Sequence, residues 1–325
     1  MTAPHDPDAG QGSPGRRRPF PGRRAWTRIG LAVLVLLLVA VSVDIALLAG
    51  RVDEVAVELG ADDSDGRTWV LVGLDSRDRL PGGADPAAFG TPEAVPGTRA
   101  DAVVVVHQTD AGTRVLSLPR DLLVIRDERR TRLTLTWQGG PRETVDVLCS
   151  IGIAADHLVT VDFAGFAEVV DAAGGLTVDV PVPVRDPGAG LELPRAGVQH
   201  VDGRTALALV RSRHPQHLVD GAWTPVPVDP DGRASAAGTV LSALVDAVRG
   251  SLVRPWRLQA VGWATTGALT VDPGTSVTDL AALAGADLST VEVVPSDHRD
   301  GAVPVALPTA GTRAAIEAAG LTCGG

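Results

Sequence analysis

Residues 69–77 read WVLVGLDSR, a short apolar run that ends in Asp75, Ser76 and Arg77. A run of this length, with a glycine inside it and charge directly after it, predicts a buried strand that leads into a functional loop. Two more apolar runs follow, at 102–107 and 114–118. The residues between them, Asp110-Ala111-Gly112, predict a hairpin turn. These strands therefore start the sheet on which the rest of the fold is built.

Further strands and helices alternate along the chain after this hairpin. Strands are expected at 176–180 and 291–294, and helices at 143–148, 163–173, 203–210, 234–248, 277–283 and 314–319. Segments rich in Pro and Gly, at 78–98 and 214–232, predict long loops. Alternation of this kind is typical of an α/β fold, and we expect an α-β-α sandwich with a central mixed sheet.

The N-terminal part differs from the rest in composition. Residues 1–28 carry six arginines among Pro and Gly and predict a disordered cytoplasmic tail. Residues 29–50 are long and apolar enough for one transmembrane anchor, and 51–67 predict an acidic juxtamembrane linker. The positive-inside rule then places the domain at 68–325 outside the cytoplasm. A cleaved signal peptide is the alternative, although no small-x-small cleavage site follows the apolar run.

Charge and cysteine content limit the function classes. From residue 50 onward the chain has 23 Arg and 36 Asp plus Glu, which disfavours nucleic acid as a partner. The basic residues are all arginine, and we attach no mechanism to this bias. The two cysteines, Cys149 and Cys323, fit no metal spacing. Outside the membrane they would form one disulfide or be two unrelated small residues.

Arginine and aspartate recur at the ends of the predicted strands and helices. The set comprises Asp75, Arg77, Arg99, Asp101, Arg120, Asp121, Arg211, Arg213 and Arg233. Each residue alone is ordinary surface decoration, but ligands of open α/β sheets gather at strand ends. Several guanidinium forks suit a ligand with several anionic oxygens, such as a pyrophosphate. The carboxylates among them suggest a hard divalent cation, Mg²⁺ with Mn²⁺ as the alternative.

Other kinds of site are less well supported. The sequence contains no P-loop motif, and its serines and histidines form no nucleophile-elbow or triad pattern. His214 and His217 lie near the arginine pair 211–213, where a metal or acid/base role is a minor alternative. We interpret His107 as a core or rim residue and His157 as structural.

In several segments the chain resembles the LytR–CpsA–Psr family of cell-wall glycopolymer transferases, in its actinobacterial form. The matching segments are VLVGLDSRD (70–78), TRADAVVVVHQTD (98–110), LSLPRDLLVI (116–125), GGP (139–141), TVDVLCSIGI (144–153), VTVDFAGFAEVVDAAGGLTVDV (159–180), VDGRTALALVRSRH (201–214) and DPDGR (229–233). Each is modest support, and the ordered set is highly specific.

The resemblance implies a function. Family members transfer a phospho-glycan from a polyprenyl-pyrophosphate lipid to a hydroxyl of peptidoglycan. The resemblance assigns Mg²⁺ to Asp75 and Asp101, and orientation of Arg120 to Asp121. The lipid tail would lie in an apolar tunnel within the sandwich. The pyrophosphate would be held by Arg77, Arg99, Arg120, Arg211, Arg213 and Arg233.

Two departures from the family pattern stand out. Ala236 and Ala237 occupy the positions where the family usually has Arg-Gln after the residue that matches Arg233. Two donors to phosphate are therefore missing, each contributing roughly 1.5–3 kcal/mol. Val198 stands where actinobacterial relatives often have a cysteine paired with one in the preceding strand.

Three functions are compatible with these residues. The first is a phosphoglycosyl transferase, slow or divergent because of Ala236 and Ala237. The second is a binding protein for polyprenyl-pyrophosphate glycans that does not turn them over, and the third is a hydrolase of the same lipids. A transcription regulator is disfavoured because the predicted domain is acidic and outside the cytoplasm.

Overall fold

A computed structural model of the chain describes residues 23–59, 65–84, 86–89, 97–226, 232–288, 290–299, 301 and 303–323. The chain divides after Leu47 into two units. Helix α1 (Arg23–Ala49) forms the first unit and runs two residues into the second. Its segment Ile29–Ala49 has a mean hydropathy of 3.0 and no buried share, so α1 is a candidate membrane span.

The helix begins earlier than the sequence suggested. We expected a disordered tail to residue 28, but Arg23–Arg28 already form the first turns of α1. The reason is local, because Pro21 and Gly22 precede the helix and no helix breaker separates Arg23 from Ile29. Residues 1–22 lie outside the described residues. Within the apolar segment, the Ser42 hydroxyl donates to the Leu38 carbonyl (2.9 Å), which satisfies its polar group inside the helix.

A seven-stranded sheet organises the second unit, and β2 (Arg67–Leu74) lies at its centre. The order is β1 (Asp53–Glu54), β14 (Leu269–Val271), β7 (His157–Asp162), β2, β3 (Ala100–Thr109), β4 (Gly112–Leu118) and β15 (Val291–Val293). β2, β3 and β4 are antiparallel neighbours, whereas β7 is parallel to β2. The mixed sheet and the hairpin at 110–112 are therefore confirmed.

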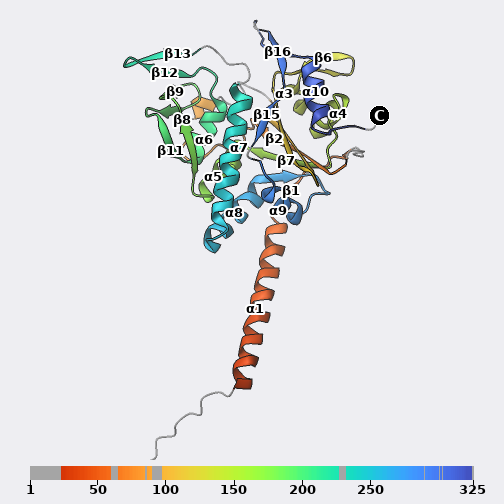
Figure 1. The fold of residues 1–325 in the computed structure, drawn as a ribbon, viewed down its shortest axis with the longest axis vertical. Helices are drawn as coiled ribbons and strands as arrows, with labels where there is room; N and C mark the ends of the chain where they lie inside the picture. Colours follow the sequence, from red (N-terminus) through yellow and green to blue (C-terminus); the bar gives the residue numbers. More distant parts are fainter. Residues whose placement is uncertain are drawn as a thin grey trace, which may run out of the picture. The chain divides into compact units, whose positions relative to one another are not determined.

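Helices cover both faces of this sheet (Figure 1). Val70 and Val72 pack in one core with α3 (Leu133–Thr136), α4 (Pro141–Ser150) and α10 (Ala310–Ala318). Trp69 faces the other way, into a core with α7 (Gly232–Ser251) and α9 (Val277–Gly285). Neighbouring side chains of a strand point to opposite faces, so one apolar run supplies both cores. The α-β-α sandwich is confirmed.

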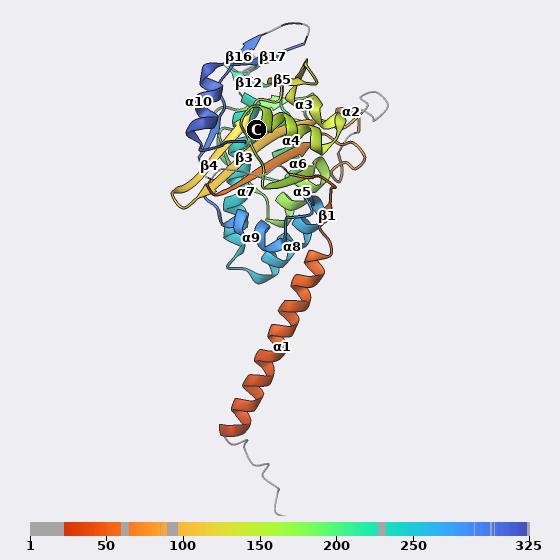
Figure 2. The same cartoon turned by 90° about the vertical axis from the view of Figure 1, so that its right-hand side faces the viewer.

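Smaller elements extend the side of the sheet that carries α7 (Figures 1 and 2). The helices there are α5 (Phe163–Ala172), α6 (Gly203–Arg211) and α8 (Pro255–Ala268). The strands are β8 (Leu176–Val180) with β11 (Gly197–Val201), and β9 (Val184–Asp186), β10 (Leu191–Leu193), β12 (Gln216–Val219) and β13 (Ala222–Pro225). Elsewhere lie α2 (Pro86–Phe89), β5 (Leu123–Arg126) with β6 (Arg129–Arg132), a 3-10 turn at Trp137–Gly139, and β16 (Ser296–Arg299) with β17 (Val305–Pro308). Val198, opposite Asp179 in the β8–β11 pair, is solvent-exposed.

Two expected loops contain regular structure. Residues 51–67 were predicted to be a linker, but β1 pairs with β14 and Val57 is buried in the core. Residues 214–232 were predicted to be a loop, but β12 and β13 form a hairpin there. Its turn is Asp220-Gly221, with φ angles of 50° and 78°, the conformation that an Asp-Gly pair favours between two antiparallel strands.

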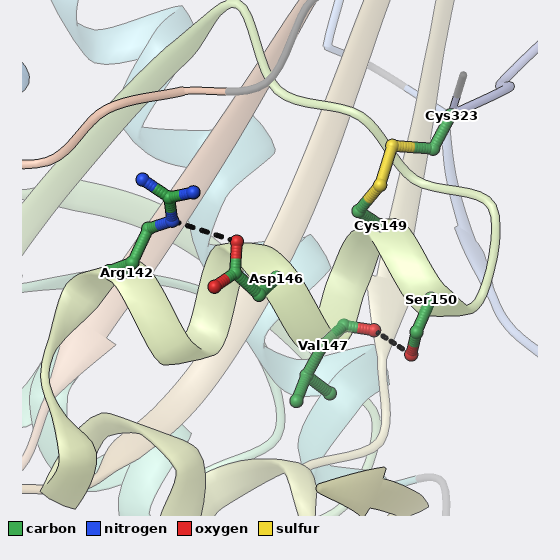
Figure 3. Close-up of a disulfide and its surroundings, with 6 residues drawn as sticks. All are labelled: Arg142, Asp146, Val147, Cys149, Ser150 and Cys323. Carbon is green, nitrogen blue, oxygen red and sulfur yellow. Dashed lines mark hydrogen bonds and ion pairs between the residues drawn. A yellow bond between two sulfur atoms is a disulfide. The ribbon is translucent and has the colours of Figure 1, made fainter. Parts of the chain in front are cut away.

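The two cysteines form a disulfide, which decides between the two interpretations left open by the sequence. Cys149 lies near the end of α4 and Cys323 lies after α10, with Cα atoms 5.3 Å apart (Figure 3). The bond joins residues separated by 174 positions. It therefore ties the C-terminal segment to the helix layer that covers one face of the sheet.

Replacing both Cys149 and Cys323 with serine is expected to lower the free energy of unfolding by about 2–5 kcal/mol. The chain-entropy relation predicts a large stabilisation by this disulfide because the loop that it closes is long. Measured stabilisations are usually smaller than this relation predicts. Chemical denaturation of the double variant measures the difference. Wild-type protein treated with a reductant should show the same loss, and equal stability of all three samples would show that the bond contributes nothing.

Candidate functional site

Asp75 and Asp101 converge because of a β-bulge between β2 and β3. Gly73 pairs with Ala102 and Leu74 pairs with Ala100, so Asp101 is the extra residue that has no partner on β2. A bulge of this kind redirects a side chain and is frequent beside functional sites. Beyond the bulge, the Asp75 N–H donates to the Arg99 carbonyl (3.0 Å). The bulge thus places both carboxylates at one end of the β2–β3 pair.

Asp75 is 2% exposed and is surrounded by arginine. Its Oδ1 accepts the Arg99 backbone N–H (2.8 Å), and its Oδ2 accepts a hydrogen bond from Arg77 Nη2 (3.2 Å). Arg99 Nε lies 3.7 Å from Oδ2 and has no hydrogen-bond partner among the described residues. Burial, followed by repulsion from Asp101, raises the pKa of Asp75 in spite of these cations. The site therefore disfavours two uncompensated carboxylates.

Asp101 is held from three directions. Its Oδ1 accepts hydrogen bonds from Arg120 Nη1 (2.5 Å) and from the Thr134 hydroxyl (3.2 Å). Its Oδ2 accepts one from Arg213 Nη2 (3.2 Å). Arg120 is 8% exposed, and its Nε lies 3.5 Å from Asp121 Oδ1. Asp121 in turn pairs with Arg132 (3.1 Å), so a chain of charges positions the Arg120 fork.

Arg211 joins this cluster from the last turn of α6. Its guanidinium lies over the Phe89 ring, 3.7 Å from the centroid, and 5.2 Å from that of Phe163. Burial is the main reason that the pKa of Arg211 is lowered to about 10, and repulsion by Arg213 and Arg77 adds to it. Several cations therefore crowd around one place, and a bound anion would relieve their repulsion.

A turn at 212–214 sets the direction of Arg213, and Asp186 organises this turn. Asp186 Oδ2 accepts hydrogen bonds from the Arg213 N–H (2.7 Å), the His214 N–H (2.8 Å) and the Ser212 hydroxyl (2.9 Å). Burial alone would raise the pKa of Asp186, but these hydrogen bonds, with that from Ala189, lower it on balance. The turn sequence Asp186-Pro187-Gly188 was the only signal for this residue in the sequence.

Changing Asp186 to Asn is expected to cost about 1.5–3 kcal/mol of stability at neutral pH, because a neutral amide cannot replace an anionic acceptor of several donors. The folded pKa of Asp186 lies below its unfolded value. The contribution of Asp186 to stability is therefore present at pH values above its unfolded-state pKa. It is lost as the pH falls through its folded-state pKa. Denaturation at pH 7 and near pH 3 should show a difference that shrinks in acid. Asp179→Asn, on an exposed position of β8, is the matched control.

A large apolar cavity of about 840 Å³ begins at this charged cluster. Asp75, Arg99, Asp101 and Arg211 lie at its polar end. From there it continues between the sheet and the helices α5, α7, α8 and α9, lined by aliphatic side chains that include Val104, Leu241, Leu244, Val261 and Leu280. An apolar cavity with convergent polar groups at one end is the usual form of a ligand site.

Ala237 borders this cavity and also a second, small one of about 30 Å³. The small cavity is bounded by Asp101, Arg120, Asp121 and His298. Ala237, at which the resemblance predicted a polar donor, therefore presents a methyl group beside the charged cluster. The helix α7 that carries Ala236 and Ala237 also contains Arg233, whose side chain lies outside the described residues.

The histidines singled out in the sequence are placed differently from one another. His107 is buried and pairs with the Thr68 hydroxyl (2.9 Å), and His157 stacks on Trp69 with centroids 4.1 Å apart. Both are core residues, as expected. His214 lines the large cavity, whereas His217 pairs with Thr224 in the β12–β13 hairpin.

Two carboxylates in the site could serve as ligands of a divalent cation. Asp75 and Asp101 are hard oxygen donors, and the raised pKa of Asp75 arises partly from Asp101. Among the described residues, no group of three or more His, Cys, Asp or Glu could form an all-protein metal site. A cation held by these two carboxylates would take its remaining ligands from water and substrate oxygens, as Mg²⁺ usually does.

Fold and site together define a class of protein, an α/β sandwich in which a cluster of arginines and aspartates opens into a large apolar cavity. The LytR_cpsA_psr family model matches residues 43–222 of this chain. A solved LytR-Csp2A-Psr enzyme from Actinomyces oris is 33% identical, with a TM-score of 0.70, and the match covers 84% of this chain and 97% of that one. The chain belongs to the LytR_cpsA_psr family.

Curated relatives support the same membership. The probable cell wall biosynthesis protein LcpB of Corynebacterium glutamicum is 33% identical over 56% of this chain and 44% of that protein. The polyisoprenyl-teichoic acid–peptidoglycan teichoic acid transferase TagV of Bacillus subtilis is 31% identical over 46% of this chain and 38% of that protein. The matches thus span less than half the length of these two relatives.

Proposed function

We propose that this protein transfers a glycopolymer from a polyprenyl-pyrophosphate carrier to a hydroxyl of peptidoglycan. The observation that carries this proposal is the continuity of the arginine cluster with the apolar cavity. A ligand that fills both must be an anion with a long apolar tail. The relative TagV, a polyisoprenyl-teichoic acid–peptidoglycan teichoic acid transferase, is named for a substrate of this kind.

The residues would divide the chemistry among them. The forks of Arg77, Arg99, Arg120, Arg211 and Arg213 would bind the pyrophosphate oxygens, as would Arg233 if it follows the family pattern. Asp75 and Asp101 would hold Mg²⁺, or Mn²⁺, which supplies charge neutralisation at the phosphates. The acceptor oxygen bonds to the phosphorus that carries the glycan, the bond to the polyprenyl phosphate breaks, and the hydroxyl proton is released. Positioning and charge are most of what such a step requires.

The proposed location is the outer face of the cytoplasmic membrane. Helix α1 would be the single anchor, with its arginine-rich N-terminal side in the cytoplasm and the domain outside. This orientation brings the domain to the side on which peptidoglycan lies. A protease added to sealed right-side-out vesicles should digest the domain but leave an N-terminal epitope tag intact.

One assay separates transfer from its alternatives. The protein is incubated with Mg²⁺ and a polyprenyl-pyrophosphate glycan, with and without a peptidoglycan acceptor. Release of polyprenyl phosphate only in the presence of acceptor supports transfer, and equal release without acceptor supports hydrolysis. Tight binding without release supports a binding protein, the second candidate, which the alanines at 236 and 237 favour.

Blocking the cavity is expected to affect long carriers selectively. Thr265 lines the cavity from α8, so Thr265→Trp should fill part of the space available to the lipid tail. We expect the transfer rate with a long-chain carrier to fall at least about tenfold, because the tail loses apolar burial. A short-chain carrier should react at the wild-type rate.

Ala282→Trp is the matched control, since Ala282 is exposed on α9 and is not part of the cavity lining. Thermal denaturation of both variants checks that they fold. Equal losses with short and long carriers would contradict the assignment of the cavity to the lipid tail.

A further inference from the structure

Five large apolar side chains are exposed together at the turn between α7 and α8 and along α8. Leu252, Val253 and Trp256 are 61%, 82% and 73% exposed, and Leu258 and Trp263 complete the group, which we call the interfacial patch. Single exposed apolar residues are common, but five of them within residues 252–263 indicate a surface that is covered in function. Two tryptophans beside aliphatic residues are typical of the boundary between membrane and water.

The local structure holds this patch outward. Helix α7 ends at Ser251, and the Leu252 and Arg254 N–H groups donate to the Arg249 and Ser251 carbonyls (3.1 and 2.9 Å). Pro255 then begins α8, where its fixed φ and missing donor are tolerated. The turn between the two helices is thus closed by backbone hydrogen bonds on both sides of Val253, and its apolar side chains are exposed.

Arg51, which follows the candidate membrane span in the chain, contacts a residue of this patch. The span ends at Ala49, and the Arg51 guanidinium lies 4.3 Å from the centroid of the Trp263 ring. A Cβ atom added to Gly267 would lie 2.7 Å from Arg51 Nη2, so this side chain packs along α8. Arg51, which follows the span, therefore packs against α8, the helix that carries Trp256, Leu258 and Trp263.

Two arginines near the interfacial patch also suit a membrane surface. Arg254 is exposed within the turn, and Arg257 follows Trp256 on α8. Arginines with their stems on apolar surface and their heads among phosphates are common at membrane interfaces. Phospholipid headgroups supply both the phosphates and, beneath them, the apolar layer that would receive Trp256 and Val253.

The patch is also continuous with the large cavity. Leu252 and Leu258 are exposed and line the cavity as well. Leu252 directly follows the end of α7, whereas Ala237, near the start of this helix, borders the small cavity beside Asp101. We propose that the interfacial patch inserts into the headgroup layer of the membrane that holds α1, so that a lipid carrier passes from the bilayer into the cavity without crossing water. This proposal rests on the anchoring of the chain by α1 proposed above.

Site-specific labelling of the full-length chain tests the insertion. The native cysteines are joined to each other, so a cysteine introduced at Val253 takes an environment-sensitive fluorophore selectively. The protein is reconstituted into phosphatidylcholine–phosphatidylglycerol vesicles with and without a lipid that carries a quencher near the headgroup. We expect the Val253→Cys label to lose at least half of its emission to the quencher and to shift to the blue.

The control is Val219→Cys, because Val219 is 52% exposed on the β12–β13 hairpin. This hairpin and α8 lie at opposite ends of the second unit in both views (Figures 1 and 2). The Val219 label should be quenched by less than about a tenth. A label at Trp256→Cys repeats the measurement if the first variant does not fold.

Each other outcome counts against the proposal in a recognisable way. Vesicle flotation is measured first, and a chain that does not float with the vesicles refutes the anchor itself. A floating chain whose Val253 and Trp256 labels are not quenched refutes insertion but leaves the anchor and the transferase function standing. A blue shift of the label that appears only at a high protein-to-lipid ratio would show that a second copy of the chain covers the patch. This result also overturns the proposal.

Discussion

Replacing Arg120 with alanine is expected to lower the rate of glycopolymer transfer by about two to four orders of magnitude. Arg120 is almost completely buried, and its Nη1 donates to Asp101 at 2.5 Å while its Nε faces Asp121. The change removes a fixed cation from the proposed phosphate site and also frees one of the carboxylates proposed to hold the metal. Single-turnover measurement with a saturating lipid carrier isolates the effect on the chemical step.

Two further variants make the result specific. Arg120→Lys keeps the charge but loses the planar fork, so we expect a rate between those of the wild type and the alanine variant. Arg126→Ala removes an arginine of β5 that pairs with Glu143 at 2.6 Å, outside the site, and should leave the rate unchanged. Equal rates for Arg120→Ala and Arg126→Ala, with both proteins folded, would show that the arginine cluster is not the reactive site.

The sequence predicted the central strands, but it did not predict how the candidate site residues at their ends meet. Apolar runs and a turn signal were sufficient for β2, β3 and β4, because a half-buried strand and a hairpin leave local patterns. The convergence of Asp75 with Asp101 depends on the bulge that leaves Asp101 without a partner. A bulge arises from the register in which two strands pair, so the sequence of either strand alone does not reveal it.

Residues that support the site were missed for a similar reason. Asp186 and Thr134 act through hydrogen bonds to segments far away in the chain, namely to Arg213 and to Asp101. An aspartate before Pro-Gly and a threonine in a short helix look ordinary until the fold brings their partners together. The β12–β13 hairpin was missed although its Asp220-Gly221 turn was visible, because the prolines around it were read as a loop.

Restoring the family's donors is expected to raise the transfer rate. The double change Ala236→Arg with Ala237→Gln replaces the Ala237 methyl group on the cavity wall with an amide and adds a guanidinium at the neighbouring position of α7. Ala237 already borders both the large cavity and the small one beside Asp101 and Arg120, so a longer side chain has space next to the cluster. Two donors at roughly 1.5–3 kcal/mol each correspond to a gain of about two to four orders of magnitude in rate.

The control is the double change Ala236→Met with Ala237→Met. It adds long side chains at both positions but no hydrogen-bond donors. The arginine variant should be less stable than the methionine variant without ligand, because another cation joins a cluster that already lowers the pKa of Arg211. A pyrophosphate ligand should reverse that order, since it supplies the anion that the cluster lacks. If both variants react at the wild-type rate, the alanines do not limit turnover, and the other arginines supply all the charge that the step requires.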